Sequence, residues 1–150
     1  MTALSLRPAR LDDADVITRF NVAMALETEG LALDPVRAGR GARALLGDPQ
    51  KGLYFVAERA GAPVGQLMIT YEWSDWRDAW WWWIQSVWVE PDARRGGVYR
   101  ALYAHVVQAA KAAGCCGVRL YVERANAKAQ ATYRALGMKQ ARYELFESEI

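Results

Sequence analysis

Residues 87–102, with the sequence VWVEPDARRGGVYRAL, are the stretch on which the predicted fold depends. The aromatic and β-branched residues over 80–89 favour a buried strand. Pro91-Asp92 ends this strand, because proline cannot continue a ladder and the pair favours a turn. Beyond Gly96-Gly97, apolar residues recur at the spacing of a helix with one face on a core: Val98, Leu102, Val106, Ala109 and Ala113. The stretch therefore predicts a strand, a turn, a glycine pair and a helix, in that order.

A helix that begins directly after two glycines favours an anion at its start. The N–H groups of its first turn have no intrahelical partner, and glycine lets a ligand approach the backbone closely. Arg94, Arg95 and Arg100 add positive charge nearby. A tight turn with solvated arginines explains the same residues, so a phosphate site and a plain turn both remain open. The Gly-Lys-Ser/Thr ending of a P-loop is absent, and a three-glycine dinucleotide fingerprint would need glycine in place of Arg100.

Two motifs in this chain resemble those of the GNAT (GCN5-related) N-acetyltransferases. Val87-x-Val89-x-Pro91 followed by Arg94-x-x-Gly97-x-Tyr99 resembles motif A, with Tyr99 in place of a small residue. Asn126-x-x-Ala129-x-x-x-Tyr133-x-x-x-Gly137-Met138 is similar to motif B, with Met where Phe is usual. The opening Leu6-Arg7-Pro8-Ala9, followed by Asp12, Asp13 and Asp15, resembles the first strand and helix of the family. The resemblance covers nearly the whole chain.

The resemblance implies that acetyl-CoA is the acyl donor. It implies that Val87, Trp88 and Val89 pair with the pantetheine arm, that the N–H of Val87 binds the thioester oxygen, and that Asn126 lies near the pantetheine or ribose. It makes Tyr133 the general acid for the departing thiolate. The pyrophosphate would lie on the backbone and charges of Arg94, Arg95, Gly96, Gly97, Val98, Tyr99 and Arg100. Alternatives are a helix N-cap for Asn126, a core tyrosine for Tyr133, and a cofactor site that Tyr99 reshapes or removes altogether.

The acceptor side is marked by tryptophans and acids. Six of the seven tryptophans fall within residues 73–83, and acids interleave with them at Glu72, Asp75 and Asp78. Aromatic rings with carboxylates suit a cationic amine, and Glu27 and Glu29 add negative charge where this family usually builds its acceptor pocket. Glu72 and Glu27 are the candidate bases, directly or through water. The alternative is that the tryptophans fill the core and a dimer surface, since alternate rings of a strand face opposite sides.

Composition excludes several classes of function. The net charge of +2 is too small to indicate a nucleic-acid or membrane-surface partner, and no apolar run is long enough to span a bilayer. The N-terminus lacks the apolar core of a signal peptide. Cys115 and Cys116 are adjacent, and with the lone His105 they make a poor metal site. We therefore expect no metal, reduced cysteines and a cytoplasmic protein.

The length of 150 residues, of which 53% are hydrophobic, predicts one domain over residues 1–150. Helices are expected at 12–27, 35–46 with Asp34 as its N-cap, 98–113 and 126–136. Strands are expected at 5–8, 52–59, 64–72, 80–89, 118–122 and 138–146, with 73–78 a loop. This alternation predicts an α/β or α+β sheet with helices on both faces. The resemblance implies a mixed, mostly antiparallel sheet with splayed central strands.

The sequence therefore predicts an acetyl-CoA-dependent N-acetyltransferase that acts on a small amine, with a cationic one favoured. Transfer to a protein amine or to a hydroxyl group is the alternative within catalysis. A non-catalytic acyl-CoA sensor is the alternative outside it, and a homodimer is left open.

Overall fold

The computed structural model describes residues 2–150, which divide into two compact units, residues 2–120 and Tyr121–Ile150. The first unit contains a five-stranded sheet in the order β1-β2-β3-β4-β5. Its strands are β1 (Leu4–Pro8), β2 (Leu53–Arg59), β3 (Ala62–Ser74), β4 (Ala79–Val89) and β5 (Gly117–Arg119). Neighbouring strands are antiparallel except for the parallel pair of β4 and β5. The mixed, mostly antiparallel sheet expected from the sequence is confirmed.

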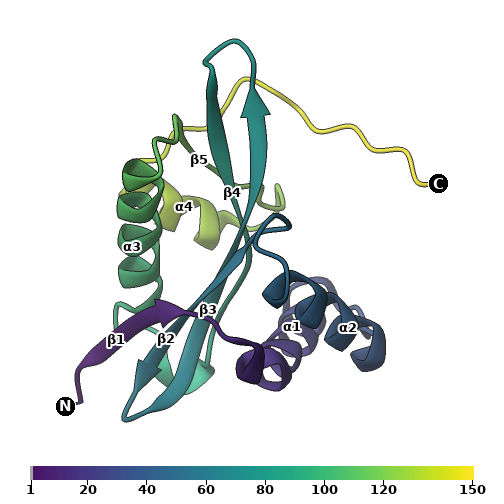
Figure 1. Cartoon of the computed structure of the whole chain (residues 1–150), viewed down its shortest axis with the longest axis vertical. Helices are drawn as coiled ribbons and strands as arrows, with labels where there is room; N and C mark the ends of the chain where they lie inside the picture. The colour runs from purple at the N-terminus through teal and green to yellow at the C-terminus, as the bar shows by residue number, and fades with distance from the viewer. Residues whose placement is uncertain (1) are drawn as a thin grey trace. The chain divides into compact units, whose positions relative to one another are not determined.

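Three helices belong to the first unit and cover both faces of its sheet (Figure 1). They are α1 (Ala14–Glu29), α2 (Pro35–Leu46) and α3 (Val98–Ala112). Short 3-10 turns, η1 (Leu11–Asp13) and η2 (Pro91–Ala93), precede α1 and α3. The side chain of Asp34 accepts a hydrogen bond from the N–H of Val36, which confirms it as the N-cap of α2. None of the helices formed by residues 2–150 has the length and apolar character needed to span a membrane.

Alternation along the strands builds two separate cores. On one face, Leu67, Ile69 and Ile84 pack with the apolar stripe of α3, of which Leu102 and Val106 are fully buried. On the other face, Tyr54 and Met68 pack with Ile17 of α1 and Ala42 of α2. The helical stripe predicted at Val98, Leu102, Val106 and Ala109 is confirmed, whereas Ala113 is exposed and is the C-cap of α3.

The parallel pair of β4 and β5 is short, and this opens one edge of β4. Only Trp81, Trp82 and Trp83 pair with β5, through Gly117, Val118 and Arg119. Within the first unit, residues 84–89 of β4 have no partner in β5, and the splay implied by the resemblance stays a prediction. β5 ends at Arg119 rather than at 122, because the chain leaves the ladder there.

The second unit contains one helix, α4 (Ala127–Ala135), and no strand among its residues. The strand predicted for 138–146 is wrong. That segment carries exposed apolar side chains at Tyr143, Leu145 and Phe146. An extended segment becomes a strand only when a neighbour satisfies its backbone groups, and no other strand exists within this unit to do so.

Candidate functional site

The loop that leads into α3 has the backbone geometry of an anion site. Arg95 and Gly97 both adopt positive φ angles, +64° and +78°, and Gly97 is the N-cap of α3. The first intrahelical hydrogen bond runs from the N–H of Ala101 to the carbonyl of Gly97 at 3.0 Å. The N–H groups of the preceding turn, residues 98–100, therefore point out of the helix start, where the helix dipole favours negative charge.

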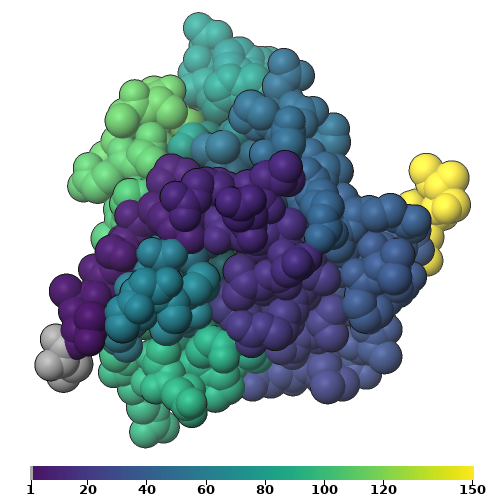
Figure 2. Space-filling model, turned by 60° about the horizontal axis from the view of Figure 1, so that its bottom comes forward, coloured from purple at the N-terminus to yellow at the C-terminus, as the bar shows by residue number. Residues whose placement is uncertain are grey.

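Glycine is required at positions 96 and 97 of this loop for different physical reasons. Gly97 needs a left-handed backbone that other residues adopt only with strain. At Gly96, an added Cβ would lie 3.1 Å from the Arg59 guanidinium and 3.2 Å from the carbonyl oxygen of Ala93. Arg59 also donates to the carbonyl of Gly96 at 3.2 Å, so the turn between β2 and β3 lies beside the segment that leads into α3 (Figure 2). Gly96 is therefore explained by packing against Arg59.

The side chain of Arg94 is held by contacts with other residues of the protein. Its Nε donates to the carbonyl of Val89 at 3.0 Å, and its guanidinium makes two hydrogen bonds to Glu27, at 2.9 and 3.0 Å. The same guanidinium lies 4.9 Å from the centre of the Trp88 ring. Arg94 therefore joins the end of α1 to the end of β4, whereas Arg95 and Arg100 are exposed at the loop.

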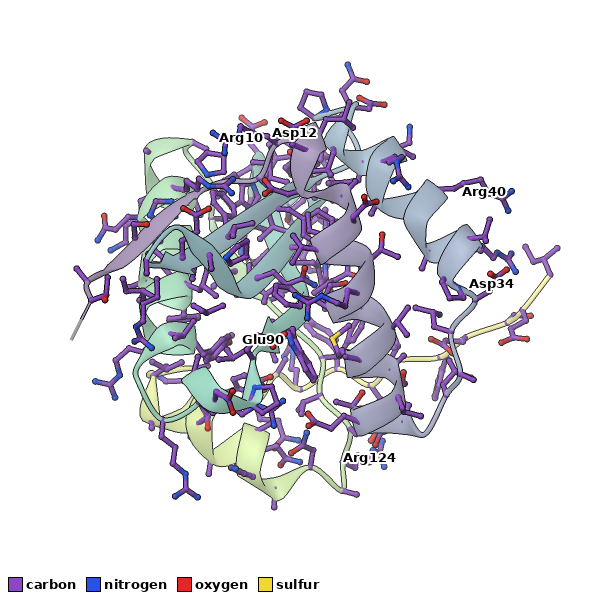
Figure 3. The ribbon with its side chains drawn as sticks, turned by 90° about the horizontal axis from the view of Figure 1, so that it is seen from below. Arg10, Asp12, Asp34, Arg40, Glu90 and Arg124 are labelled. Atoms are coloured by element: carbon purple, nitrogen blue, oxygen red, sulfur yellow. The ribbon has the colours of Figure 1, made fainter. Side chains whose placement is uncertain are left out.

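Side chains around the end of β4 point inward. The Trp88 side chain is buried and donates through Nε1 to Glu90 at 3.2 Å, and Glu90 also pairs with Arg19 of α1 at 3.3 Å. Figure 3 labels Glu90 beside α1. Tyr99 packs against the α3 core with its ring 6.3 Å from that of Tyr103. Its side chain therefore points into the core while its backbone belongs to the first turn of α3.

The predicted tryptophan alternation is confirmed. Trp82 is buried under α3, and Trp80 stacks edge to face on Trp73 of β3 on that same face. Trp81 and Trp83 face the other side. There the indole of Trp83 donates to Glu72 at 2.8 Å, and Arg119 pairs with the second oxygen of Glu72 at 2.8 Å. We call this group of Trp81, Trp83, Glu72 and Arg119 the tryptophan shelf.

The structure separates the two candidate bases. Glu72 pairs with Trp81, and Val87 lies roughly 17–20 Å further along β4 at about 3.3 Å per residue. Glu72 and Val87 therefore lie far apart on β4, and the role of Glu72 as a base, directly or through water, stays a prediction. Glu27 is tied by Arg94 to Val89, two positions beyond Val87, and both of its oxygens are occupied by Arg94.

The second unit carries the two residues of the predicted motif B. The side chain of Asn126 accepts from the N–H of Ala129 at 3.0 Å, so Asn126 is the N-cap of α4. This bond uses Oδ1, and the Nδ2 group keeps its donors for another partner. Tyr133 is half-buried, and burial raises the pKa of its hydroxyl, which stays protonated at neutral pH.

Comparison with known proteins identifies the family. The sequence pattern of the acetyltransferase (GNAT) family matches residues 22–138. The chain is 42% identical to a possible acetyltransferase from Clostridium difficile 630, with a TM-score of 0.93 over 98% of this chain and 97% of that one. This chain belongs to the GNAT acetyltransferase family. It is therefore an acyltransferase of the N-acetyltransferase type, with a GNAT-like fold.

More distant GNAT structures share the fold alone. A ribosomal-protein-alanine N-acetyltransferase from Brucella melitensis biovar Abortus 2308 is 16% identical, with a TM-score of 0.81 over 99% of both chains. A GCN5-related N-acetyltransferase from Ralstonia eutropha JMP134 is 18% identical, with a TM-score of 0.78 over 97% of this chain and 99% of that one. None of the curated protein sequences matches the chain.

Three features of this GNAT site were missed by sequence reasoning. Ser86 has a positive φ of +49° at a β-bulge, Gln66 is completely buried, and Glu90 accepts hydrogen bonds from two elements. An uncharged polar residue in a strand gives no signal of a bulge. The pattern Val-Glu-Pro at the end of β4 was visible, but only the fold brings Arg19 to it.

The described residues show neither a disulfide nor a group of possible metal ligands. Cys115 and Cys116 are both free thiols, and burial raises the pKa of Cys115, which favours its neutral form. Among residues 2–150, no three His, Cys, Asp or Glu side chains gather where they could hold a metal ion.

Proposed function

We propose that this GNAT protein transfers the acetyl group of acetyl-CoA to the amine of a small, cationic substrate. The observation that carries the proposal is the juxtaposition, within the first unit, of two features. These are the helix start at residues 98–100 and the open edge of β4 over residues 84–89. Acetyl-CoA has a pyrophosphate and an arm that carries amide groups, so its binding needs both features.

The backbone of this region holds and polarises the donor. The N–H groups at the start of α3, with Arg95 and Arg100, bind the pyrophosphate. The open edge of β4 pairs with the pantetheine amides, and the N–H of Val87 donates to the thioester oxygen. A hydrogen-bond donor fixed at that oxygen stabilises the negative charge that develops there when the amine attacks.

Two side chains move the protons. The amine nitrogen attacks the thioester carbon and loses a proton to Glu27, through water or after its pair with Arg94 opens. The carbon–sulfur bond then breaks, and Tyr133 donates its hydroxyl proton to the departing thiolate. The Nδ2 group of Asn126 donates hydrogen bonds to the same acetyl-CoA molecule.

The cationic character of the acceptor is supported by the tryptophan shelf. The ring of Trp81 already binds cations, because the guanidinium of Arg119 lies 3.8 Å and that of Arg77 5.2 Å from its centre. Glu72 keeps unused lone pairs beside this ring. The negative charge of Glu72 favours a cationic acceptor from a distance, since it lies about 17–20 Å from Val87 along the strand.

The first experiment tests donor binding through Gly97→Glu. Acetyl-CoA at 100 times its Kd stabilises a binding protein by about 2.7 kcal/mol, so the wild-type Tm rises. Gly97→Glu abolishes this rise because its carboxylate repels the pyrophosphate. Gly114→Glu is the matched control, because Gly114 has a φ of +77°, an open Cβ position and a place at the other end of α3. A folded Gly97→Glu variant that binds acetyl-CoA as tightly as wild type contradicts the assigned site.

The second experiment measures free thiol released from acetyl-CoA over a panel of amines and matched alcohols. We expect turnover with cationic amines and less than a tenth of it with alcohols. Stabilisation by acetyl-CoA without turnover on any acceptor indicates a sensor and removes the catalytic proposal. The cytoplasmic location stays a prediction from the sequence.

A further inference from the structure

Strand β4 carries a β-bulge where its outer edge is open. Gln66 pairs with Trp88 and Met68 with Gln85, so Ser86 and Val87 together stand opposite Leu67. The φ of Ser86 is +49°. A left-handed backbone is uncommon for a residue other than glycine and persists only where the surroundings hold it. The bulge therefore requires contacts that fix its conformation.

The side chain of Gln66 supplies one such contact. Gln66 is completely buried, with 0% of its surface exposed. Its Nε2 donates to the carbonyl of Ser86 at 3.1 Å and to Oδ1 of Asn21 at 2.8 Å. These two bonds use both N–H groups of the amide, so Gln66 joins the bulge of β4 to helix α1.

Two further side chains complete this network. The Nδ2 group of Asn21 donates to the hydroxyl of Tyr54 at 3.1 Å, and Tyr54 is buried, with 5% of its surface exposed. Elements α1, β2 and β3 therefore each contribute one side chain, of which Tyr54 and Gln66 are buried, and the network reaches the carbonyl of Ser86.

The direction of the Val87 N–H follows from the geometry of the peptide bond. The carbonyl of Ser86 and the N–H of Val87 belong to one planar trans unit and point in opposite directions. Gln66 on β3 holds the carbonyl oxygen, so the N–H points away from Gln66. The pairs between β4 and β5 end at Trp83. The N–H of Val87 therefore points out from the edge of β4 that has no β5 partner.

We propose that Gln66 is a positioning residue for acetyl transfer, which holds the Ser86 carbonyl so that the Val87 N–H points at the thioester oxygen. This inference rests on the proposed function, in which that N–H polarises the thioester. Gln66 is buried and touches no substrate, and it acts only through the Ser86–Val87 peptide. Its amide is the group that matters, because a side chain of the same length without a donor leaves the Ser86 carbonyl unheld.

Gln66→Met tests this role, since it keeps the length of the side chain and removes the donor. We expect kcat to fall about 10-fold to 100-fold, because a donor displaced by about 1 Å loses its contact with the developing oxyanion. The Kd of acetyl-CoA should stay within about twofold, because the pyrophosphate contacts are untouched. In NMR spectra, acetyl-CoA should shift the amide resonance of Val87 in the wild type and not in the variant.

Val106→Ala is the matched control for lost stability. Val106 is fully buried in the α3 core and is not part of the network, so this variant should lower the Tm and leave kcat near that of wild type. A kcat of folded Gln66→Met within about threefold of wild type overturns the inference and leaves the proposed function standing. Wild-type protein with no turnover on any amine removes the proposed function, and the inference with it.

Gln66→Glu keeps the inference testable if Gln66→Met does not fold. A neutral carboxyl can donate to the Ser86 carbonyl, whereas a carboxylate cannot. The kcat of this variant relative to wild type should therefore fall as the pH rises from about 5 to 9. Burial raises the pKa of Tyr54, the titratable group that faces this network, so it stays protonated over that range. A ratio that does not change with pH overturns the inference.

Discussion

At the residue scale, Glu27 is the candidate base that Arg94 ties to the end of β4. This pair is solvent-exposed, with 39% and 48% of the two side chains accessible, so it opens at little cost. Glu27→Gln keeps a hydrogen bond to Arg94 and removes the base. We expect kcat for an amine to fall by at least about 10-fold at neutral pH.

The matched variant for Glu27→Gln is Glu72→Gln. It removes the other candidate carboxylate, and it should raise the KM of the amine while kcat stays within about threefold. The measurement is kcat and KM for one amine at saturating acetyl-CoA. If Glu72→Gln lowers kcat more than Glu27→Gln does, the assignment of the base is wrong.

Tyr133 can be tested by removing one atom. Tyr133→Phe keeps the ring and its packing, and we expect kcat to fall about 100-fold with little change in acetyl-CoA affinity. That loss is at the low end for a general acid, because a thiol with a pKa near 8.5 is already a good leaving group. A tyrosine that only packs predicts a lower Tm and a kcat within about threefold of wild type, and that result ends the general-acid assignment.

At the element scale, the junction of β4 and β5 depends on one glycine. An added Cβ at Gly117 would lie 2.5 Å from the Trp81 ring, which the guanidinium of Arg119 covers from a distance of 3.8 Å. Gly117→Ala must displace that ring and with it the tryptophan shelf. We therefore expect a change in tryptophan fluorescence, a loss of about 1–3 kcal/mol of stability and a higher KM for a cationic amine.

Gly41→Ala is the control for Gly117→Ala. Gly41 lies inside α2 with open space at its Cβ position, so alanine should stabilise the protein by about 0.5–1 kcal/mol. The Kd of acetyl-CoA should be the same in both variants and in wild type. An unchanged amine KM in Gly117→Ala means that the acceptor does not use the shelf.

At the scale of the whole molecule, the predictable features are local and the missed ones are long-range. The helix after Gly97 was predictable because its stripe repeats within 15 residues, as were the N-cap at Asp34 and the alternation of Trp80 to Trp83. The bond from Gln66 to Ser86 and the pair of Arg94 with Glu27 join residues 20 and 67 positions apart. Only the fold decides such contacts. The strand expected at 138–146 failed for the same reason, because a strand needs a partner.

The stability of the first unit at low pH should depend on one buried carboxylate. Arg7 of β1 makes two hydrogen bonds to Asp13, at 2.8 and 2.9 Å, and bonds to Glu58 of β2 at 2.7 Å. Asp13 is 6% exposed and also accepts from the N–H of Arg10 at 2.7 Å. The hydrogen bonds from Arg7 are the main cause that lowers the pKa of Asp13, and the N–H of Arg10 adds to it. The folded protein therefore binds the Asp13 proton more weakly than the unfolded chain does.

The sign of the pH dependence follows from that lowered pKa. The stabilising contribution of Asp13 is complete above its unfolded pKa of about 3.9 and is lost as the pH falls through the lower folded value. Asp13→Asn should cost about 2 kcal/mol at pH 7, and its difference from wild type should shrink below pH 4 in urea titrations. Asp15→Asn, which breaks only the exposed pair with Arg43, should cost less than about 1 kcal/mol. A difference between Asp13→Asn and wild type that stays constant from pH 7 to pH 2 would show that the Asp13 carboxylate does not link folding to pH.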